Sequence, residues 1–213
     1  MKQQCYIILL AVFYSGILFG NIDYKTFPIA KITKMIGKAT ILPPHSLKSK
    51  DLKSGDLLLK DSSIYVGKKS VVKIQFINKS TMSIGPNSKT IIDMDIDSKT
   101  SVISFLTGKI RTKVNKEKKK KNDKKFYIKT KNAVMGVRGT DFQVTFNPKG
   151  ERTSLLTYNG QVDIKKVSIP NSGPHSLKSL KESLSRDFES VKKGDFVNLN
   201  SKSKKVTRPI KIN

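Results

Sequence analysis

Cysteine, histidine and acidic residues are all scarce in this chain of 213 residues. The single cysteine, Cys5, lies in an N-terminal apolar run, so the rest of the chain can form no internal disulfide. The two histidines have no cysteine beside them and give no zinc-site spacing. The 16 acidic residues lie mostly on polar faces, so no pair of carboxylates in an apolar pocket can be proposed.

Motifs of the common enzyme classes are also missing. The sequence has no Gly-x-Ser-x-Gly elbow, no His-Glu-x-x-His helix and no Gly-x-x-x-x-Gly-Lys phosphate loop. Three spaced aspartates from Asp93 resemble the start of a calcium loop, but Ser98 stands where that loop needs glycine and Ser104 where it needs glutamate. We therefore expect no enzyme, with no catalytic residues, cofactor or metal.

Basic residues, in contrast, are abundant. The chain has 42 lysines and arginines and a formal net charge of +26. Such a surface attracts polyanions over long range. In an exported protein these anions are lipid head groups, lipopolysaccharide phosphates or acidic glycans more often than nucleic acid. A lysine-rich source proteome would give the same composition, and this alternative stays open.

The first 20 residues predict export through a membrane. Lys2 is their one charged residue, and an apolar run from Cys5 to Phe19 ends at Gly20, a small residue suited to a cleavage site. The run is about 15 residues long, which fits a signal-peptide core and is short of the roughly 20 that a membrane span needs. We expect a signal peptide at residues 1–20 and a periplasmic mature chain. An uncleaved anchor, which would be the chain's one link to the membrane, is the alternative.

The middle of the chain reads as short strands separated by turns. Apolar and polar residues alternate in 71–77, 92–97 and 142–146, the period-2 pattern of half-buried strands. Asn159-Gly160 is the strongest two-residue hairpin signal. Strands recur about every 8 to 12 residues from Leu52 to Lys165, which predicts an all-β domain, either a compact β-sandwich or a short β-helix-like fold.

Three further features complete this prediction. A first strand is expected at residues 38–42, before two prolines. The strand-like runs 101–106 and 109–114 are hinged at Gly108. Between them and the next strand lies a basic loop without apolar residues, expected to be solvated, with anion binding as the alternative. Its candidate anion-binding residues are Lys116, Lys118, Lys119, Lys120, Lys121, Lys124 and Lys125.

The pattern changes after Ile169. A Pro- and Gly-containing linker is followed by apolar residues at steps of 3, 4, 4 and 3, which predicts one C-terminal amphipathic helix from Ser176 to Gly194. The five apolar residues are Leu177, Leu180, Leu184, Phe188 and Val191. A last strand is expected at 195–199. The predicted organisation is thus a lead-in at 21–51, a β domain at 52–165 and a C-terminal part at 166–213 with linker, helix and basic tail.

A glycine-punctuated turn stands at the centre of the chain. Residues 132–144, Asn-Ala-Val-Met-Gly-Val-Arg-Gly-Thr-Asp-Phe-Gln-Val, join this turn to a strand. Gly136-Val-Arg-Gly139 has the form of the Gly-x-x-Gly loop of nucleic-acid-binding KH domains, but that loop joins two helices, whereas Phe142 to Phe146 is strand-like. Nucleic acid is therefore not an expected partner.

The same residues resemble the FecR domain, named for the periplasmic regulator of ferric dicitrate uptake. The resemblance runs from Leu52 to Lys165 and includes the order of the flanking strands and turns. It implies an all-β domain outside the cytoplasm that works through protein or ligand contacts, without catalysis. The motif residues, to which we assign a structural role, are Gly136, Val137, Arg138, Gly139, Thr140 and Phe142.

The resemblance sets several expectations. Gly136 and Gly139 should adopt positive φ or sit where another chain segment approaches closely. Arg138 should reach backbone carbonyls or a carboxylate such as Asp141, and Thr140 should start the strand. The short segment before the apolar run argues against a cytoplasmic anti-sigma tail. We therefore expect a binding or scaffold module for an envelope polyanion or an acidic protein. A sensor component of a transmembrane signalling or iron-uptake system is the alternative.

Overall fold

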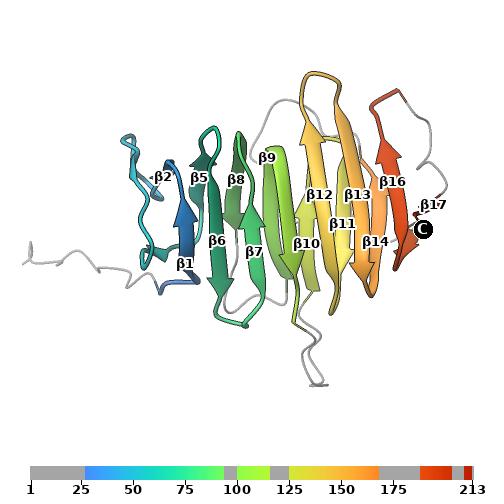
Figure 1. Ribbon diagram of the computed structural model, residues 1–213, viewed down its shortest axis with the longest axis horizontal. Helices are drawn as coiled ribbons and strands as arrows, with labels where there is room; N and C mark the ends of the chain where they lie inside the picture. The colour runs from blue at the N-terminus through green and yellow to red at the C-terminus, as the bar shows by residue number, and fades with distance from the viewer. Residues whose placement is uncertain (1–26, 94–99, 116–124, 168–187, 203–208, 213) are drawn as a thin grey trace, which may run out of the picture.

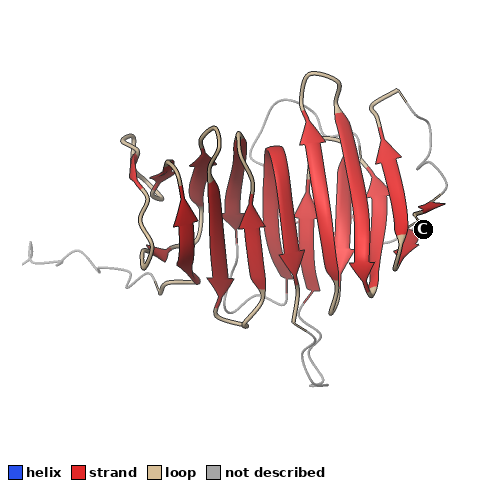
Figure 2. Cartoon of the chain, viewed as in Figure 1, coloured by secondary structure: helices blue, strands red, loops and turns tan. Residues whose placement is uncertain are grey.

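A computed structural model describes residues 27–93, 100–115, 125–167, 188–202 and 209–212. These residues form 17 strands and, within the described ranges, no helix (Figure 2). The strands stand side by side along the long axis of the molecule, in two layers (Figure 1). The all-β prediction is therefore confirmed for the described part of the chain.

The first layer, sheet A, is antiparallel throughout. Its spatial order starts with a two-residue edge strand and ends with another. The strands in that order are β4 (Leu57–Leu58), β1 (Ala30–Ile36), β6 (Val71–Phe76), β7 (Thr81–Ile84), the second part of β9 (Thr100–Lys113), β12 (Asp141–Asn147), β13 (Arg152–Asn159), β16 (Asp195–Leu199) and β17 (Ile210–Lys211).

The second layer, sheet B, has one parallel pair, formed by β9 and β10. Its other pairs are antiparallel. The strands in spatial order are β3 (Lys50–Asp51), β2 (Ala39–Leu42), β5 (Ser62–Val66), β8 (Ser88–Asp93), the first part of β9, β10 (Lys125–Lys129), β11 (Ala133–Val137), β14 (Gln161–Lys166) and β15 (Glu189–Lys192).

Strand β9 belongs to both sheets, because it bends from one to the other at Gly108. Residues before Gly108 pair with β8, and residues from Gly108 onward pair with β12. Gly108 has φ +101, and a Cβ there would lie 2.6 Å from the Cα of Ser88. No other residue type fits such a site without backbone movement. The predicted hinge is therefore confirmed, although the structure makes one continuous strand of the two predicted runs.

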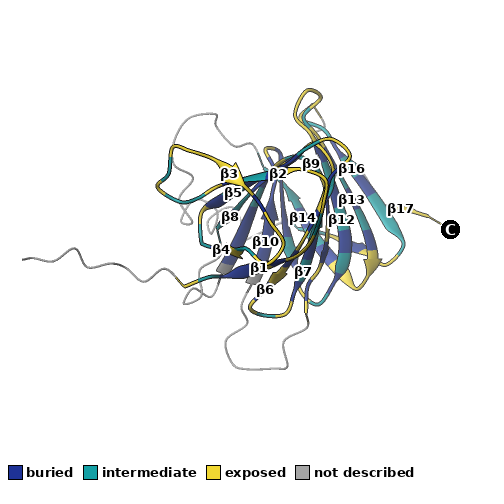
Figure 3. Cartoon of the chain, turned by 60° about the vertical axis from the view of Figure 1, so that its left-hand side comes forward, coloured by how far each residue is buried: buried dark blue, intermediate teal, exposed yellow. Residues whose placement is uncertain are grey.

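The core lies between the two layers. Inward-facing side chains of both sheets, including Ile74, Phe105, Phe142 and Ile164, form one continuous apolar cluster. Phe76 of sheet A and Phe126 of sheet B meet edge to face across the interior, with ring centroids 6.3 Å apart. Burial of each such side chain contributes about 1.5–3 kcal/mol. Buried and exposed residues alternate along the strands accordingly (Figure 3).

The segments on either side of the predicted domain contribute to the same layers. Strand β1, which the sequence pattern did not predict, pairs with β6, and its Ile32 lies in the core. Strand β2 confirms the strand expected at residues 38–42 and pairs with β5. Beyond the predicted domain, β16 confirms the strand expected at 195–199 and pairs with β13.

The predicted C-terminal helix is wrong at its end. Residues 189–192 form strand β15, which pairs with β14 and buries Val191 in the core. The first three leucines of the predicted helical face lie outside the described residues. A spacing of 3 or 4 residues would place Val191 on one helical face with Leu184 and Phe188. In the structure, pairing with β14 at the sheet edge makes residues 189–192 a strand instead.

The predicted hairpin at Asn159-Gly160 is also wrong. The turn is present and Gly160 has φ +82, but β13 and β14 do not pair with each other. Strand β13 pairs with β12 and β16 in sheet A, whereas β14 pairs with β11 and β15 in sheet B. The turn therefore carries the chain from one layer to the other.

Candidate functional site

The segment from Asn132 to Phe142 connects the two sheets. Strand β11 lies in sheet B and β12 in sheet A, so the turn at residues 138–140 crosses between them. Val137 and Phe142, on either side of the turn, are buried in the core. Gly139 has φ +60, as expected from the sequence. A Cβ on Gly136 would lie 3.3 Å from the ring of Tyr127, so the close approach predicted there is made by a side chain.

Thr140 fastens the end of this turn. Its buried hydroxyl lies 2.7 Å from the carbonyl oxygen of Gln161 and 3.1 Å from that of Arg138. The backbone carbonyl of Thr140 accepts a hydrogen bond of 2.9 Å from the N–H of Val114. The residue therefore links the ends of β9, β11 and β14, and β12 begins at the next residue.

Asn132 fastens the opposite end of β11. Its side-chain amide donates to the backbone carbonyls of Glu151 and Leu199, and its carbonyl oxygen accepts from the hydroxyl of Thr153. The hydroxyl of Thr130 lies 2.8 Å from that of Thr153. The asparagine and both threonines are buried, so this cluster satisfies its own polar groups inside the protein. Sequence reasoning missed the two threonines.

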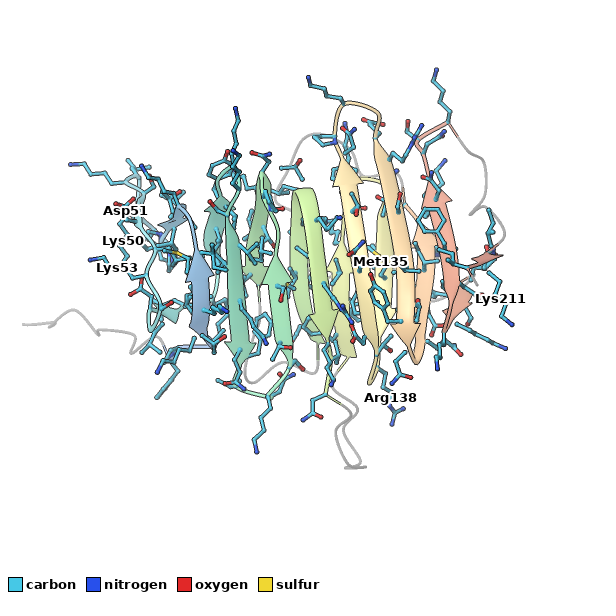
Figure 4. The ribbon with its side chains drawn as sticks, viewed as in Figure 1. Lys50, Asp51, Lys53, Met135, Arg138 and Lys211 are labelled. Carbon is cyan, nitrogen blue, oxygen red and sulfur yellow. The ribbon has the colours of Figure 1, made fainter. Side chains whose placement is uncertain are left out.

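Arg138 lies exposed at the end of the sandwich and points away from the strands (Figure 4). The carboxylate of Asp141, one of the partners expected for it, is held by Arg111 of β9. The guanidinium of Arg111 donates two hydrogen bonds of 2.9 Å to the two oxygens of Asp141. This contact, more than any other, raises the pKa of Arg111. The structural role assigned to Arg138 stays a prediction.

Arg111 also lies over an aromatic ring on the outer face of sheet A. Its guanidinium carbon is 4.1 Å from the centroid of the Tyr158 ring, a cation–π distance. The hydroxyl of Tyr158 in turn lies 3.5 Å from the amide oxygen of Gln143. One carboxylate and one ring thus fix the arginine. Sequence reasoning missed Arg111; the signal that could have found it is a single arginine among lysines in an alternating strand.

Exposed lysines extend from this arginine across the outer face of sheet A. The strand register places Lys34, Lys73, Ser83, Arg111 and Gln143 in one row across β1, β6, β7, β9 and β12. Lysines 31, 109 and 113 flank that row and are exposed. The strands β1, β6, β7 and β9 carry no acidic residue on this face, and Asp141 of β12 is engaged by Arg111. We call this surface the basic face.

The comparisons with known proteins agree with the motif. The family model described as "FecR protein" matches residues 62–163. Residues 62–163 form a FecR domain. No curated protein matches the sequence.

The FecR domain also resembles solved structures in fold. Two crystal structures of a proposed anti-sigma factor from Parabacteroides distasonis ATCC 8503, at 2.50 and 1.65 Å resolution, superpose with a TM-score of 0.53 at 12% sequence identity. The match covers 71% of this chain and 60% of that protein. The likeness therefore shows a shared fold over part of a longer protein.

The outer face of sheet B differs from the basic face. Val102, Tyr127 and Val134 are buried there and form a second apolar cluster with Val167, apart from the core. Lys129 is buried beside them, since it pairs with Val134 in the strand register. Burial lowers the pKa of Lys129 and raises that of Tyr127.

The lysines predicted for anion binding lie at the edge of what the structure describes. Lys116, Lys118, Lys119, Lys120, Lys121 and Lys124 fall outside the described residues, and Lys125 is the first residue of β10. Their role stays a prediction.

The part of the chain that the structure describes also bears on metal and membrane sites; its residues lie both inside and outside the FecR domain. They contain no group of three or more His, Cys, Asp and Glu side chains that could hold a metal ion. Asp93, first of the three spaced aspartates, ends β8 with its carboxylate 3.8 Å from the ammonium of Lys60, and Asp95 and Asp97 lie outside this part. No helix within it has the length and hydropathy to cross a membrane.

Proposed function

We propose that this chain is a non-enzymatic binding module of a regulatory system at the cell envelope, and that the basic face takes an anionic glycan. The family match and the shared fold support a role in regulation. The apolar run at residues 5–19 supports an extracytoplasmic location. The observation that favours an anionic glycan as the ligand is the row of exposed cations across sheet A.

The geometry of the row suits an extended polymer. Adjacent strands lie about 4.8 Å apart, so Lys73 and Arg111, two strands apart, present positive groups roughly 10 Å from each other. Ser83 and Gln143 place hydrogen-bonding groups beside them. A chain of sugars with repeated acidic groups meets both kinds of group along one flat surface. Arg111 is held by Asp141 and Tyr158, so little side-chain entropy is lost when it binds.

The test is retention on immobilised heparin, an anionic glycan, in a salt gradient. The variant that disrupts the basic face changes Lys73, of the row, and Lys109 and Lys113, which flank it, to glutamate. A matched variant changes three exposed lysines, Lys48, Lys50 and Lys53, to glutamate. Lys50 and Lys53 lie at the β3 end of the molecule (Figure 4). Both have the same net charge, so the difference between them reports the site.

We expect the sheet A variant to elute at lower salt than the matched variant. Equal elution of the two variants would show that net charge alone attracts the glycan. Retention that ignores salt would also contradict the proposal, because exposed charges are screened within about 10 Å at 0.1 M salt. Retention on polyglutamate but not on heparin would assign the face to an acidic protein instead.

A sensor component of a transmembrane signalling system is the second candidate. The fold shared with a proposed anti-sigma factor favours it. In that case a partner protein binds this chain, and co-purification from solubilised membranes should recover the partner in equal amounts with the matched and the sheet A variants.

A further inference from the structure

Three large apolar side chains are exposed at the end of sheet A where β1 begins. Phe27, Leu57 and Ile77 are 67%, 58% and 53% exposed. We call them the β1-end patch.

Backbone hydrogen bonds place these residues around one point. The N–H of Ile29 donates to the carbonyl of Leu58 over 2.8 Å, and the N–H of Ile77 donates to the carbonyl of Ile29 over 3.1 Å. The start of β1 therefore lies between Leu57–Leu58 and Ile77, and Phe27 is two residues away. With strands about 4.8 Å apart, the patch is roughly 10 Å wide. Figure 1 shows the start of β1 next to the end of β6.

Lysines border the patch. Lys31 is exposed and pairs with Leu57 in the strand register. Lys79 is exposed in the turn after β6, and Lys53 is exposed in the turn before β4. The nearby carboxylate of Asp56 accepts a hydrogen bond of 2.8 Å from the backbone N–H of Lys53. Apolar side chains bordered by lysine are the composition of surfaces that rest on anionic membranes.

The length of the sequence before the patch indicates what binds to the patch. The apolar run ends at Phe19, and seven residues separate it from Phe27. Seven extended residues span at most about 25 Å. In the form that keeps this run as an uncleaved anchor in a bilayer, this end of the domain therefore stays within reach of the membrane surface. A soluble partner would have no such reason to meet this end rather than another.

We propose that the β1-end patch rests on an anionic lipid bilayer, with Phe27, Leu57 and Ile77 among the lipid head groups and acyl boundary. Lys31, Lys53 and Lys79 contact the lipid phosphates. The domain is then oriented with β1 starting at the membrane. Of the lysines on the basic face, only Lys31 takes part in this contact.

The absence of tryptophan from the sequence makes a direct test possible. A single tryptophan at Leu57→Trp or Ile77→Trp reports its own surroundings by fluorescence. The matched control is Ile36→Trp, because Ile36 is 54% exposed and pairs with Val71 at the other end of the same two strands. Circular dichroism checks that the variants fold.

Each full-length variant is mixed with vesicles of phosphatidylglycerol and phosphatidylcholine, with and without brominated acyl chains. We expect emission at 57 and 77 to shift to shorter wavelength and to lose intensity on brominated lipid, with no change at 36. Equal emission at all three positions, or quenching at 36 alone, would overturn the proposal. Equal quenching at 57 and 77 on pure phosphatidylcholine, which has no net charge, would overturn the part of the proposal that requires an anionic bilayer.

Discussion

The hydroxyl of Thr140 lies 2.7 Å from the carbonyl oxygen of Gln161, so the end of the FecR motif is tied to the first residue of β14. At the other end of β11, Asn132 is tied to the backbone of Glu151 and Leu199. Thr140 and Asn132 are both buried, and both contacts join segments that are distant in sequence. Thr140 and Asn132 thus connect the two layers at the two ends of β11.

Thr140→Val tests this fastening. Valine keeps the shape of the side chain but leaves the carbonyl of Gln161 without the hydroxyl. We expect the free energy of unfolding to fall by about 1–3 kcal/mol, the cost of an unsatisfied buried group. Urea denaturation measures it, with Thr145→Val on the outer side of β12 as the control. Equal effects at both positions would contradict the role of the hydroxyl.

Gly139→Ala tests the turn. At φ +60 a Cβ is strained, so we expect a loss of about 1 kcal/mol or more in the free energy of unfolding. Gly150→Ala is the control, because a Cβ there meets nothing within 4 Å and no positive φ requires glycine. Thermal melting and heparin retention are measured together. Unchanged melting with lost retention would instead make the motif a recognition site.

The sequence predicted local conformation better than strand pairing. Alternation placed β6 and β12 correctly because each buries one face, and that pattern is contained in a few consecutive residues. Asn159-Gly160 predicted a turn correctly and its pairing wrongly, since a turn residue fixes backbone angles but not the layer that the next strand joins. Val191 fitted a helical spacing, yet its segment forms β15 and pairs with β14 at the edge of sheet B.

In the candidate site, too, the sequence predicted local features but not contacts between distant strands. The motif glycines followed from local sequence, whereas the contact of Arg111 with Asp141 and Tyr158 depends on the pairing of β9 with β12 and of β12 with β13. Those residues are 30 and 47 positions away from Arg111 in the chain. No local pattern encodes such a contact.

Lys129→Met tests the buried lysine on sheet B. Burial lowers the pKa of Lys129, so its charged form costs stability at neutral pH, and the cost decreases as pH rises toward the ordinary value of 10.5. We therefore expect the methionine variant to be more stable than the parent at pH 7, with a difference that shrinks in alkali. Urea denaturation at several pH values measures this, with Lys73→Met on the basic face as the control. A destabilised variant would contradict it.

Glu151→Gln tests the ion pair that borders the Asn132 cluster. The carboxylate of Glu151 lies 2.5 Å from the ammonium of Lys131, and this hydrogen bond is the main cause of its lowered pKa. Because the folded state prefers the charged form, its contribution is complete above the ordinary value of 4.5 and is lost as pH falls through the lower folded value. Parent and variant should therefore be equally stable in strong acid and diverge as pH rises, the parent becoming the more stable. In a Lys131→Met background most of this pH-dependent difference should disappear. If the difference stays the same in that background, Lys131 is not the main cause of the shift.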